Sequence, residues 1–201
     1  MAVSLRTRAR RCAPALSALL LAALLSGCAA AIVGGGVAAA TMASDRRSLG
    51  NQIDDQTLER AMRRQVSAHE GSLAGARVKP VAHNGTLLLV GEVANAAQRD
   101  RVAALAGQLA GVKRVVNELA VADEAGPWRR TRDTVLNGRA KTALLNVKLA
   151  GFDATKVNVT TVRGEVYLMG LVTREEGNRA VDAIRELRGV RRIVKVFEYL
   201  D

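Results

Sequence analysis

The chain has 201 residues, a formal net charge of +11 and a pI near 10.7, values that on their own would suggest a nucleic-acid partner. Aromatic residues make up only 2% of the sequence, and this scarcity argues against nucleic acid, because single strands stack their bases on aromatic rings. Two cysteines are too few for a disulfide framework. Because 49% of the residues are hydrophobic and only 2% aromatic, the core is predicted to consist mainly of Ala, Val and Leu.

Residues 1–27 are predicted to be a secretory signal peptide. Four arginines and no acidic residue precede an apolar run over 15–25, which is too short for a comfortable membrane span. The next segment, Leu25-Ser26-Gly27-Cys28, resembles the lipobox of bacterial lipoproteins. That resemblance implies cleavage before Cys28 and attachment of fatty acyl chains, palmitate among them, to this cysteine. An ordinary signal peptide with an incidental cysteine is the alternative.

Residues 28–51 are predicted to be the lipidated cysteine and a flexible tether, since this segment is rich in Ala and Gly. Cys12 lies in the part that would be removed, so no disulfide is expected in the mature chain. Loss of four arginines with the signal peptide leaves a mature charge of +7. Ala29 is not the acidic residue that commonly retains such lipoproteins at the inner membrane. We therefore expect an outer-membrane location, facing the periplasm.

The remainder of the chain is an internal repeat. Residues 84–93 are echoed by 163–172 at an offset of 79, and residues 111–116 by 189–194 at an offset of 78. Two separate blocks at nearly one period indicate two homologous lobes. Lobe one is predicted to span 52–123 and lobe two 127–201, joined across a short segment that ends at Pro127.

Each lobe is predicted to run helix, strand, strand, helix, strand. In lobe one the helices are expected over 56–68 and 95–109, and the strands over 76–82, 86–93 and 112–121. Asp54-Asp55 and Asn95 are assigned as helix caps, and Asn84-Gly85 as a hairpin turn. In lobe two the helices are expected over 128–149 and 174–187, and the strands over 155–162, 165–172 and 190–199. A helix between the second and third strands favours a right-handed crossover and a parallel pair. The fold class is therefore α+β, with two helices on one face of each three-stranded mixed sheet.

Four glycines are interpreted as structural. Gly85 and Gly164 would supply the positive φ that the hairpin turns need. Gly91 and Gly170 are expected to end strands where a side chain would strike the packing helix.

The order of these motifs resembles a known family. Each lobe begins with a helix that carries Asp-x-x-Leu, at Asp55 and Leu58 in lobe one and at Asp133 and Leu136 in lobe two. A turn glycine, a strand closing on glycine, a second helix and a Gly-Val before the last strand follow in both lobes. This pattern resembles the BON domain. Two such domains behind a lipobox are similar to the dual-BON outer-membrane lipoproteins of Gram-negative bacteria, the DolP type. The resemblance covers nearly all of the mature chain. It implies binding of anionic phospholipid at the inner leaflet of the outer membrane and a role in envelope integrity.

The positive charge is concentrated in lobe two. Residues 54–123 hold nine Lys and Arg against eight Asp and Glu, whereas residues 128–201 hold fifteen against nine. This difference suggests that lobe two meets a polyanion, although a basic surface that only aids solubility would give the same count.

The only Trp of the chain, Trp128, begins the first helix of lobe two. Helical periodicity places Trp128, Arg132, Val135 and Arg139 along one edge of the predicted core stripe. An indole among arginines suits a membrane interface, because the ring lies at headgroup depth and each guanidinium can meet a phosphate. The expected partner is an anionic phospholipid membrane, with phosphatidylglycerol or cardiolipin as the candidates that agree with the family resemblance. The predicted phospholipid-binding residues are Trp128, Arg129, Arg130, Arg132, Val135, Arg139 and Lys141. The alternative is that Trp128 packs between the lobes.

Catalysis is not expected. The two histidines, His69 and His83, both fall in lobe one, and no phosphate-binding loop, nucleophile or metal-ligand spacing is recognised. Asp133, like Asp54 and Asp55, is assigned as a helix cap. No cofactor is expected beyond the covalent lipid, and the chain is expected to be a monomer. An adaptor for envelope or division proteins, with lipid only as its anchor, is the second functional hypothesis.

Overall fold

The computed structural model describes residues 49–200, with the side chains of the first helix described from Asp54 onward. The predicted signal peptide, Cys28 and nearly all of the predicted tether therefore lie outside the described residues. Both lobes belong to one compact unit. No helix within residues 49–200 is long and apolar enough to span a bilayer.

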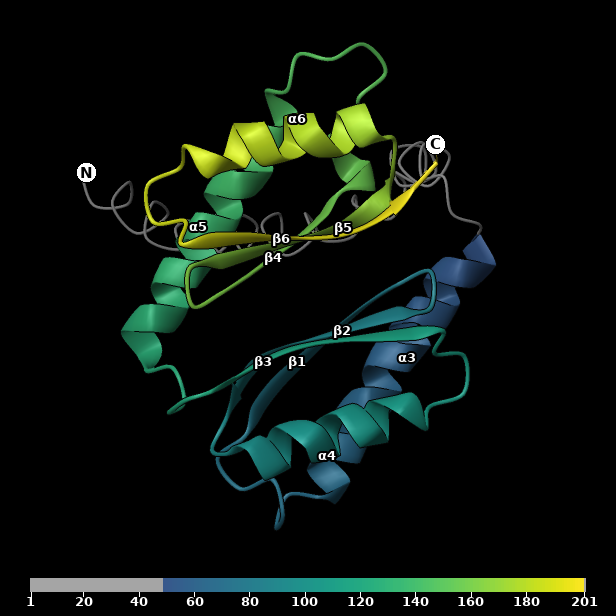
Figure 1. Ribbon diagram of the computed structural model, residues 1–201, viewed down its shortest axis with the longest axis vertical. Coiled ribbons are helices and arrows are strands. Elements are labelled where there is room, and N and C mark those ends of the chain that lie inside the picture. Colours follow the sequence, from purple (N-terminus) through teal and green to yellow (C-terminus); the bar gives the residue numbers. More distant parts are fainter. Residues whose placement is uncertain (1–48, 201) are drawn as a thin grey trace, which may run out of the picture. The chain divides into compact units, whose positions relative to one another are not determined.

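The two lobes have the same order of elements, with one short addition in lobe two (Figure 1). The elements of lobe one are α3 (Leu49–Ala68), β1 (Arg77–His83), β2 (Thr86–Val93), α4 (Ala96–Gly107) and β3 (Arg114–Val121). The elements of lobe two are α5 (Pro127–Leu145), the 3-10 helix η3 (Ala154–Lys156), β4 (Asn158–Val162), β5 (Glu165–Val172), α6 (Arg174–Arg185) and β6 (Arg192–Tyr199).

Each lobe contains a three-stranded mixed sheet, which confirms the predicted α+β class. In lobe one β2 is central, antiparallel to β1 and parallel to β3, and in lobe two β5 holds the same position between β4 and β6. The helices α4 and α6 make the crossovers between the parallel strands. Two helices cover one face of each sheet (Figure 1).

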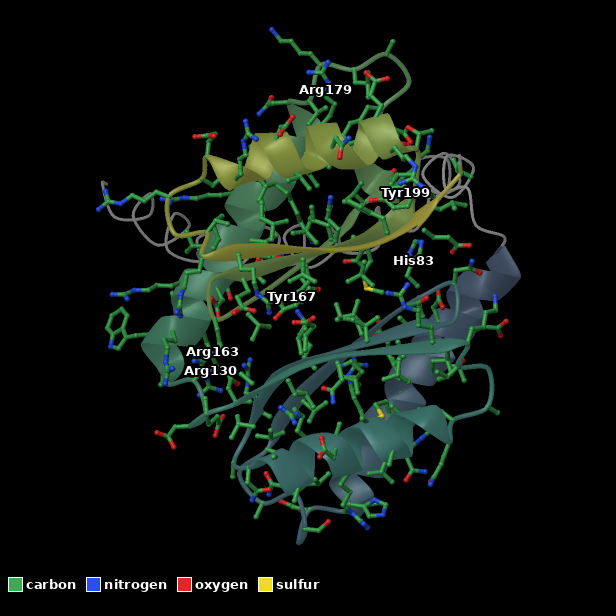
Figure 2. All side chains as sticks on the ribbon, in the orientation of Figure 1. His83, Arg130, Arg163, Tyr167, Arg179 and Tyr199 are labelled. Atoms are coloured by element: carbon green, nitrogen blue, oxygen red, sulfur yellow. The ribbon has the colours of Figure 1, made fainter. Side chains whose placement is uncertain are left out.

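The opposite faces of the two sheets pack against each other. Along β2, Leu87 and Leu89 enter the core beneath the helices, whereas Leu88 and Val90 join a separate apolar cluster between the lobes. Lobe two contributes Val162, Tyr167, Met169 and Val196 to this cluster, and Figure 2 shows Tyr167 in the layer between the sheets. Because both faces of β2 are buried, the strand has a continuous apolar run instead of an alternating pattern.

Several element ends differ from the prediction. The helix α3 begins at Leu49, so Asp54 and Asp55 lie within it and are not its caps. The helix α5 ends at Leu145, where the Asn146 side chain bonds the Thr142 carbonyl at 3.0 Å and its backbone N–H turns to Ala143. The strand β4 begins at Asn158 because η3 precedes it. Asn95 does cap α4, accepting from the Gln98 N–H at 2.9 Å.

The glycines of the central strands are required for a reason other than the predicted one. A Cβ at Gly91 would overlap the Arg77 carbonyl oxygen, and a Cβ at Gly170 would overlap the Lys156 carbonyl oxygen. The obstacle at Gly91 is the backbone of β1, and the obstacle at Gly170 is the last residue of η3; neither belongs to the α-helices that cover the sheets. Both glycines lie within their strands. At the hairpin turns, Gly85 and Gly164 have φ of +78° and +75°.

Candidate functional site

The orientation of α5 places Trp128 at the surface. Pro127 occupies the first turn, where its missing N–H costs no helical hydrogen bond. Leu136 and Leu144 are buried in the core of lobe two, and this face fixes the rotation of the helix about its axis. Trp128 is consequently 81% exposed and Val135 49% exposed. The alternative in which the indole packs between the lobes is therefore wrong.

A groove of about 890 Å³ runs beside Trp128, and we call it the α5 groove. Its walls come from α5, from the β4–β5 turn and from the loop that precedes β6. The residues that carry its character are the apolar pair Trp128 and Val135 and six arginines, Arg129, Arg132, Arg139, Arg163, Arg188 and Arg191, with Asp133 as its one carboxylate. A surface of this composition can hold an anionic group beside an apolar one.

Five of the seven predicted binding residues line the α5 groove: Trp128, Arg129, Arg132, Val135 and Arg139. The other two lie elsewhere. Arg130 forms an ion pair with Glu124 at 3.8 Å. Lys141 lies close to Lys79 of lobe one. Burial is the main cause that lowers the Lys79 pKa, and the positive charges of Arg77 and Lys141 lower it further.

Three groove arginines were not predicted, because they come from other elements. Arg163 lies on the β4–β5 turn, and Arg188 and Arg191 lie on the loop before β6. The internal repeat carries a signal for them. At the repeat offsets of 79 and 78, lobe one has Asn84, Ala110 and Lys113 at the corresponding positions. Two of the three positions are thus basic in lobe two alone.

Asp133 joins α5 to the turn that forms one wall of the groove. Its carboxylate accepts hydrogen bonds from the Arg163 and Gly164 N–H groups, each at 2.8 Å. Asp55 does the same in lobe one, accepting from Asn84 at 2.8 Å and Gly85 at 3.0 Å. The interpretation of Asp55 and Asp133 as helix caps is therefore wrong, because both carboxylates bind a hairpin turn distant in sequence.

Most of the groove arginines have no acidic partner within residues 49–200. The ion pairs found there do not include Arg129, Arg132, Arg139, Arg188 or Arg191. Their charges therefore remain available to an external anion.

Comparison with known proteins identifies the lobes. Residues 54–123 and residues 132–201 each match the family model for the BON domain. The chain belongs to the BON-domain family. Lobe one is the first BON domain and lobe two the second.

Two relatives cover most of the chain. The outer membrane lipoprotein DolP of Haemophilus influenzae is 40% identical over 166 residues, which cover 81% of this chain and 83% of that protein. The 21 kDa hemolysin of Actinobacillus pleuropneumoniae is 31% identical, over 80% of this chain and 81% of that one. Among solved structures, the C-terminal domain of CdsD from the type III secretion system of Chlamydia trachomatis shares 13% identity, covering 69% of this chain and 96% of that one, with a TM-score of 0.28.

The histidines do not form a site with the groove. His69 lies at the end of α3, with its Nδ1 2.8 Å from the Gln65 carbonyl oxygen, and His83 is buried at the end of β1. Within residues 49–200 no group of three His, Cys, Asp or Glu side chains is placed to hold a metal ion.

A charged cluster joins the two BON domains at the edge of the apolar layer. Arg192 donates to Glu118 of the first domain at 2.7 Å and to Glu165 of the second at 2.6 Å. Tyr167 donates to the same Glu165 carboxylate at 2.8 Å. Burial opposes ionisation of Glu165, but the hydrogen bonds from Arg192 and Tyr167 outweigh it and lower the Glu165 pKa. Burial and the bond to Glu165 raise the pKa of Tyr167.

This cluster predicts a loss of stability in acid. Because the folded-state pKa of Glu165 is lower than its usual 4.5, its contribution is complete above 4.5 and is lost as the pH falls through the lowered value. Glu165→Gln should lower the free energy of unfolding by about 1 kcal/mol at pH 7. Urea unfolding of both proteins should give a difference that shrinks below about pH 4. A difference that is constant with pH would contradict this role for the Glu165 charge.

Proposed function

We propose that this chain is a non-enzymatic outer-membrane lipoprotein, anchored through Cys28 and facing the periplasm, whose second BON domain binds anionic phospholipid in the α5 groove and so supports envelope integrity. The observation that carries the proposal is an indole, 81% exposed, at the edge of a groove with six arginines and one carboxylate.

The chemistry of the groove favours phospholipid over other anions. Indole rings partition to the headgroup region of a bilayer, where an apolar body and a polar N–H are both accommodated. Guanidinium groups bind phosphate through paired hydrogen bonds. The groove offers both kinds of group side by side, with Trp128 and Val135 on the same helix as Arg132 and Arg139.

The expected affinity suits a protein that is already anchored. Each basic residue near an anionic membrane contributes on the order of 1 kcal/mol, and this contribution weakens with salt. Such attraction alone is reversible, so the acyl chains on Cys28 would supply residence and the groove a choice of lipid. The relationship to an outer membrane lipoprotein and the lipobox resemblance support the same location.

Trp128→Glu tests the proposal in a version of the chain that begins after Cys28, so that binding does not depend on acylation. We expect co-sedimentation with phosphatidylglycerol vesicles to fall at least about tenfold, because a carboxylate replaces the indole and repels the lipid phosphate. Arg130→Gln is the matched control, since Arg130 is on the same helix but outside the groove, and it should change binding less than about threefold.

Vesicles of phosphatidylcholine carry no net charge and should bind neither the wild type nor the two variants. Unchanged binding of Trp128→Glu to phosphatidylglycerol would remove the basis of the proposal and favour the adaptor hypothesis.

A further inference from the structure

Arg163 also borders a second cavity, separate from the α5 groove. This cavity, of about 250 Å³, is lined by residues of both BON domains. Its polar side chains are Arg99, Asn117 and Glu118 from the first domain and Arg163, Glu165, Tyr167 and Arg192 from the second. Arg163 is the single residue common to the cavity and the groove, and Figure 2 shows it at the β4–β5 turn.

Arg163 is held in an unfavourable conformation and environment. Its φ is +57°, a left-handed value in which Cβ lies close to a backbone carbonyl oxygen, whereas Asn84, at the same turn of the first domain with φ of +49°, belongs to a residue type that tolerates this region. Its Nη1 is buried and has no hydrogen-bond partner among residues 49–200. A buried guanidinium N–H without an acceptor is destabilising, and such outliers concentrate at functional sites.

The acceptors already present in the cavity are engaged by other donors. Arg192 binds Glu118 and Glu165, and the Tyr167 hydroxyl donates to Glu165. The Asn117 side chain donates to the Arg99 backbone carbonyl and accepts from the Leu119 N–H. In the described part of the chain, the Arg99 guanidinium pairs only with an exposed carboxylate, that of Asp100, through Nε at 3.3 Å. Three arginines therefore face two carboxylates, and the missing component is an acceptor with negative charge.

We propose that this cavity binds a phosphate-class oxyanion between Arg163 of the second BON domain and Arg99 of the first. The volume corresponds to roughly eight water molecules, enough for a tetrahedral anion with part of its hydration shell. Because its two cations come from different domains, the anion stabilises the packing of one domain on the other. The anion is either free phosphate or the phosphate of a lipid headgroup that enters from the α5 groove.

Inorganic phosphate is the probe for the first source. The mature lipidated chain in non-ionic detergent is titrated with sodium phosphate against sodium chloride at equal ionic strength, with thermal unfolding and calorimetry as the readouts. We expect the Tm to rise to a plateau with sodium phosphate and not with sodium chloride. Fluorescence of Trp128, the only Trp, should not change, because the indole borders the groove and not the cavity.

A short-chain phosphatidylglycerol below its micelle concentration is the probe for the second source. If the headgroup phosphate enters the cavity, this lipid shifts Trp128 fluorescence and also displaces inorganic phosphate. If the cavity takes free phosphate only, the lipid shifts the fluorescence without displacing phosphate. Both results support an oxyanion site.

Two substitutions test the assigned residues. Arg163→Asn, which copies Asn84, and Arg99→Gln should each weaken phosphate binding at least about tenfold, and Arg163→Asn should raise the Tm without phosphate. Arg188→Gln is the matched control, because Arg188 lines the groove only, and it should keep wild-type phosphate binding. Trp128→Glu should lose vesicle binding but keep the phosphate response, so the two proposals can fail separately. Equal phosphate effects in wild type and Arg163→Asn, or no effect beyond sodium chloride, would overturn the oxyanion site.

Discussion

Gly170→Ala is expected to unfold the second BON domain at temperatures where the wild type is folded. A Cβ at Gly170 would overlap the Lys156 carbonyl oxygen, and backbone cannot move aside as the end of a flexible side chain can. The neighbouring segment would have to separate from β5, which is the central strand. We expect the free energy of unfolding to fall by more than about 3 kcal/mol, measured by urea unfolding followed by circular dichroism.

Gly91→Ala should have an equal or larger effect on the first BON domain, because Gly91 also has φ of +135°. Gly138→Ala is the matched control. Gly138 lies on α5 with no atom near its absent Cβ, so this change should stabilise the protein by roughly 0.5–1 kcal/mol. A loss of less than about 1 kcal/mol in Gly170→Ala would show that the carbonyl contact can relax.

The same glycines show how far the sequence predicts this fold. The strands, the crossover helices and the two lobes follow from the repeat, because hydrophobic period and turn residues are local signals. That Gly91 and Gly170 are structural also follows from their repetition. The atoms that a Cβ would strike cannot be predicted in this way, since the carbonyl oxygens of Arg77 and Lys156 approach the two glycines only in the folded domains.

The residues of the α5 groove likewise fall into a set that the sequence predicts and a set that it does not. The stripe from Trp128 to Arg139 lies on one helix, so the period of 3.6 residues is sufficient to place its members side by side. Arg163, Arg188 and Arg191 reach the same groove from a turn and a loop. Their proximity depends on how α5 packs across the sheet. A comparison of the two repeats marks Arg163 and Arg188, which replace Asn84 and Ala110, but it does not mark Arg191, which replaces Lys113.

The beginning of α3 shows how a local rule can mislead. Asp54-Asp55 before an apolar period resembles a helix start, because Asp is a favoured N-cap. In the structure the Asp55 carboxylate accepts hydrogen bonds from the N–H groups of Asn84 and Gly85, so it stabilises the tertiary fold. The N-cap preference of Asp contributes about 1 kcal/mol, which is less than the two charge-assisted hydrogen bonds that Asp55 makes with the turn contribute together.

Asp133→Ala is expected to destabilise the second BON domain by about 2–4 kcal/mol and to weaken phosphatidylglycerol binding as well. The change removes both acceptors of the Arg163 and Gly164 N–H groups, and donors left without partners cost more than the bonds themselves contribute. The turn carries Arg163 into the α5 groove, so loosening it should disturb that wall. Urea unfolding measures the first effect, and vesicle co-sedimentation below the unfolding temperature measures the second.

Asp54 and Asp55 offer the comparison that separates a turn-binding carboxylate from a helix cap. Both belong to α3, but Asp54 is exposed whereas Asp55 is 4% exposed and bonded to the turn. Asp55→Ala should therefore match Asp133→Ala in stability, while Asp54→Ala should stay within about 0.5 kcal/mol of wild type. Vesicle binding should fall in Asp133→Ala alone, because the first domain lacks the arginine groove. Equal losses of stability in Asp54→Ala and Asp55→Ala would contradict the turn-binding role of the Asp55 carboxylate.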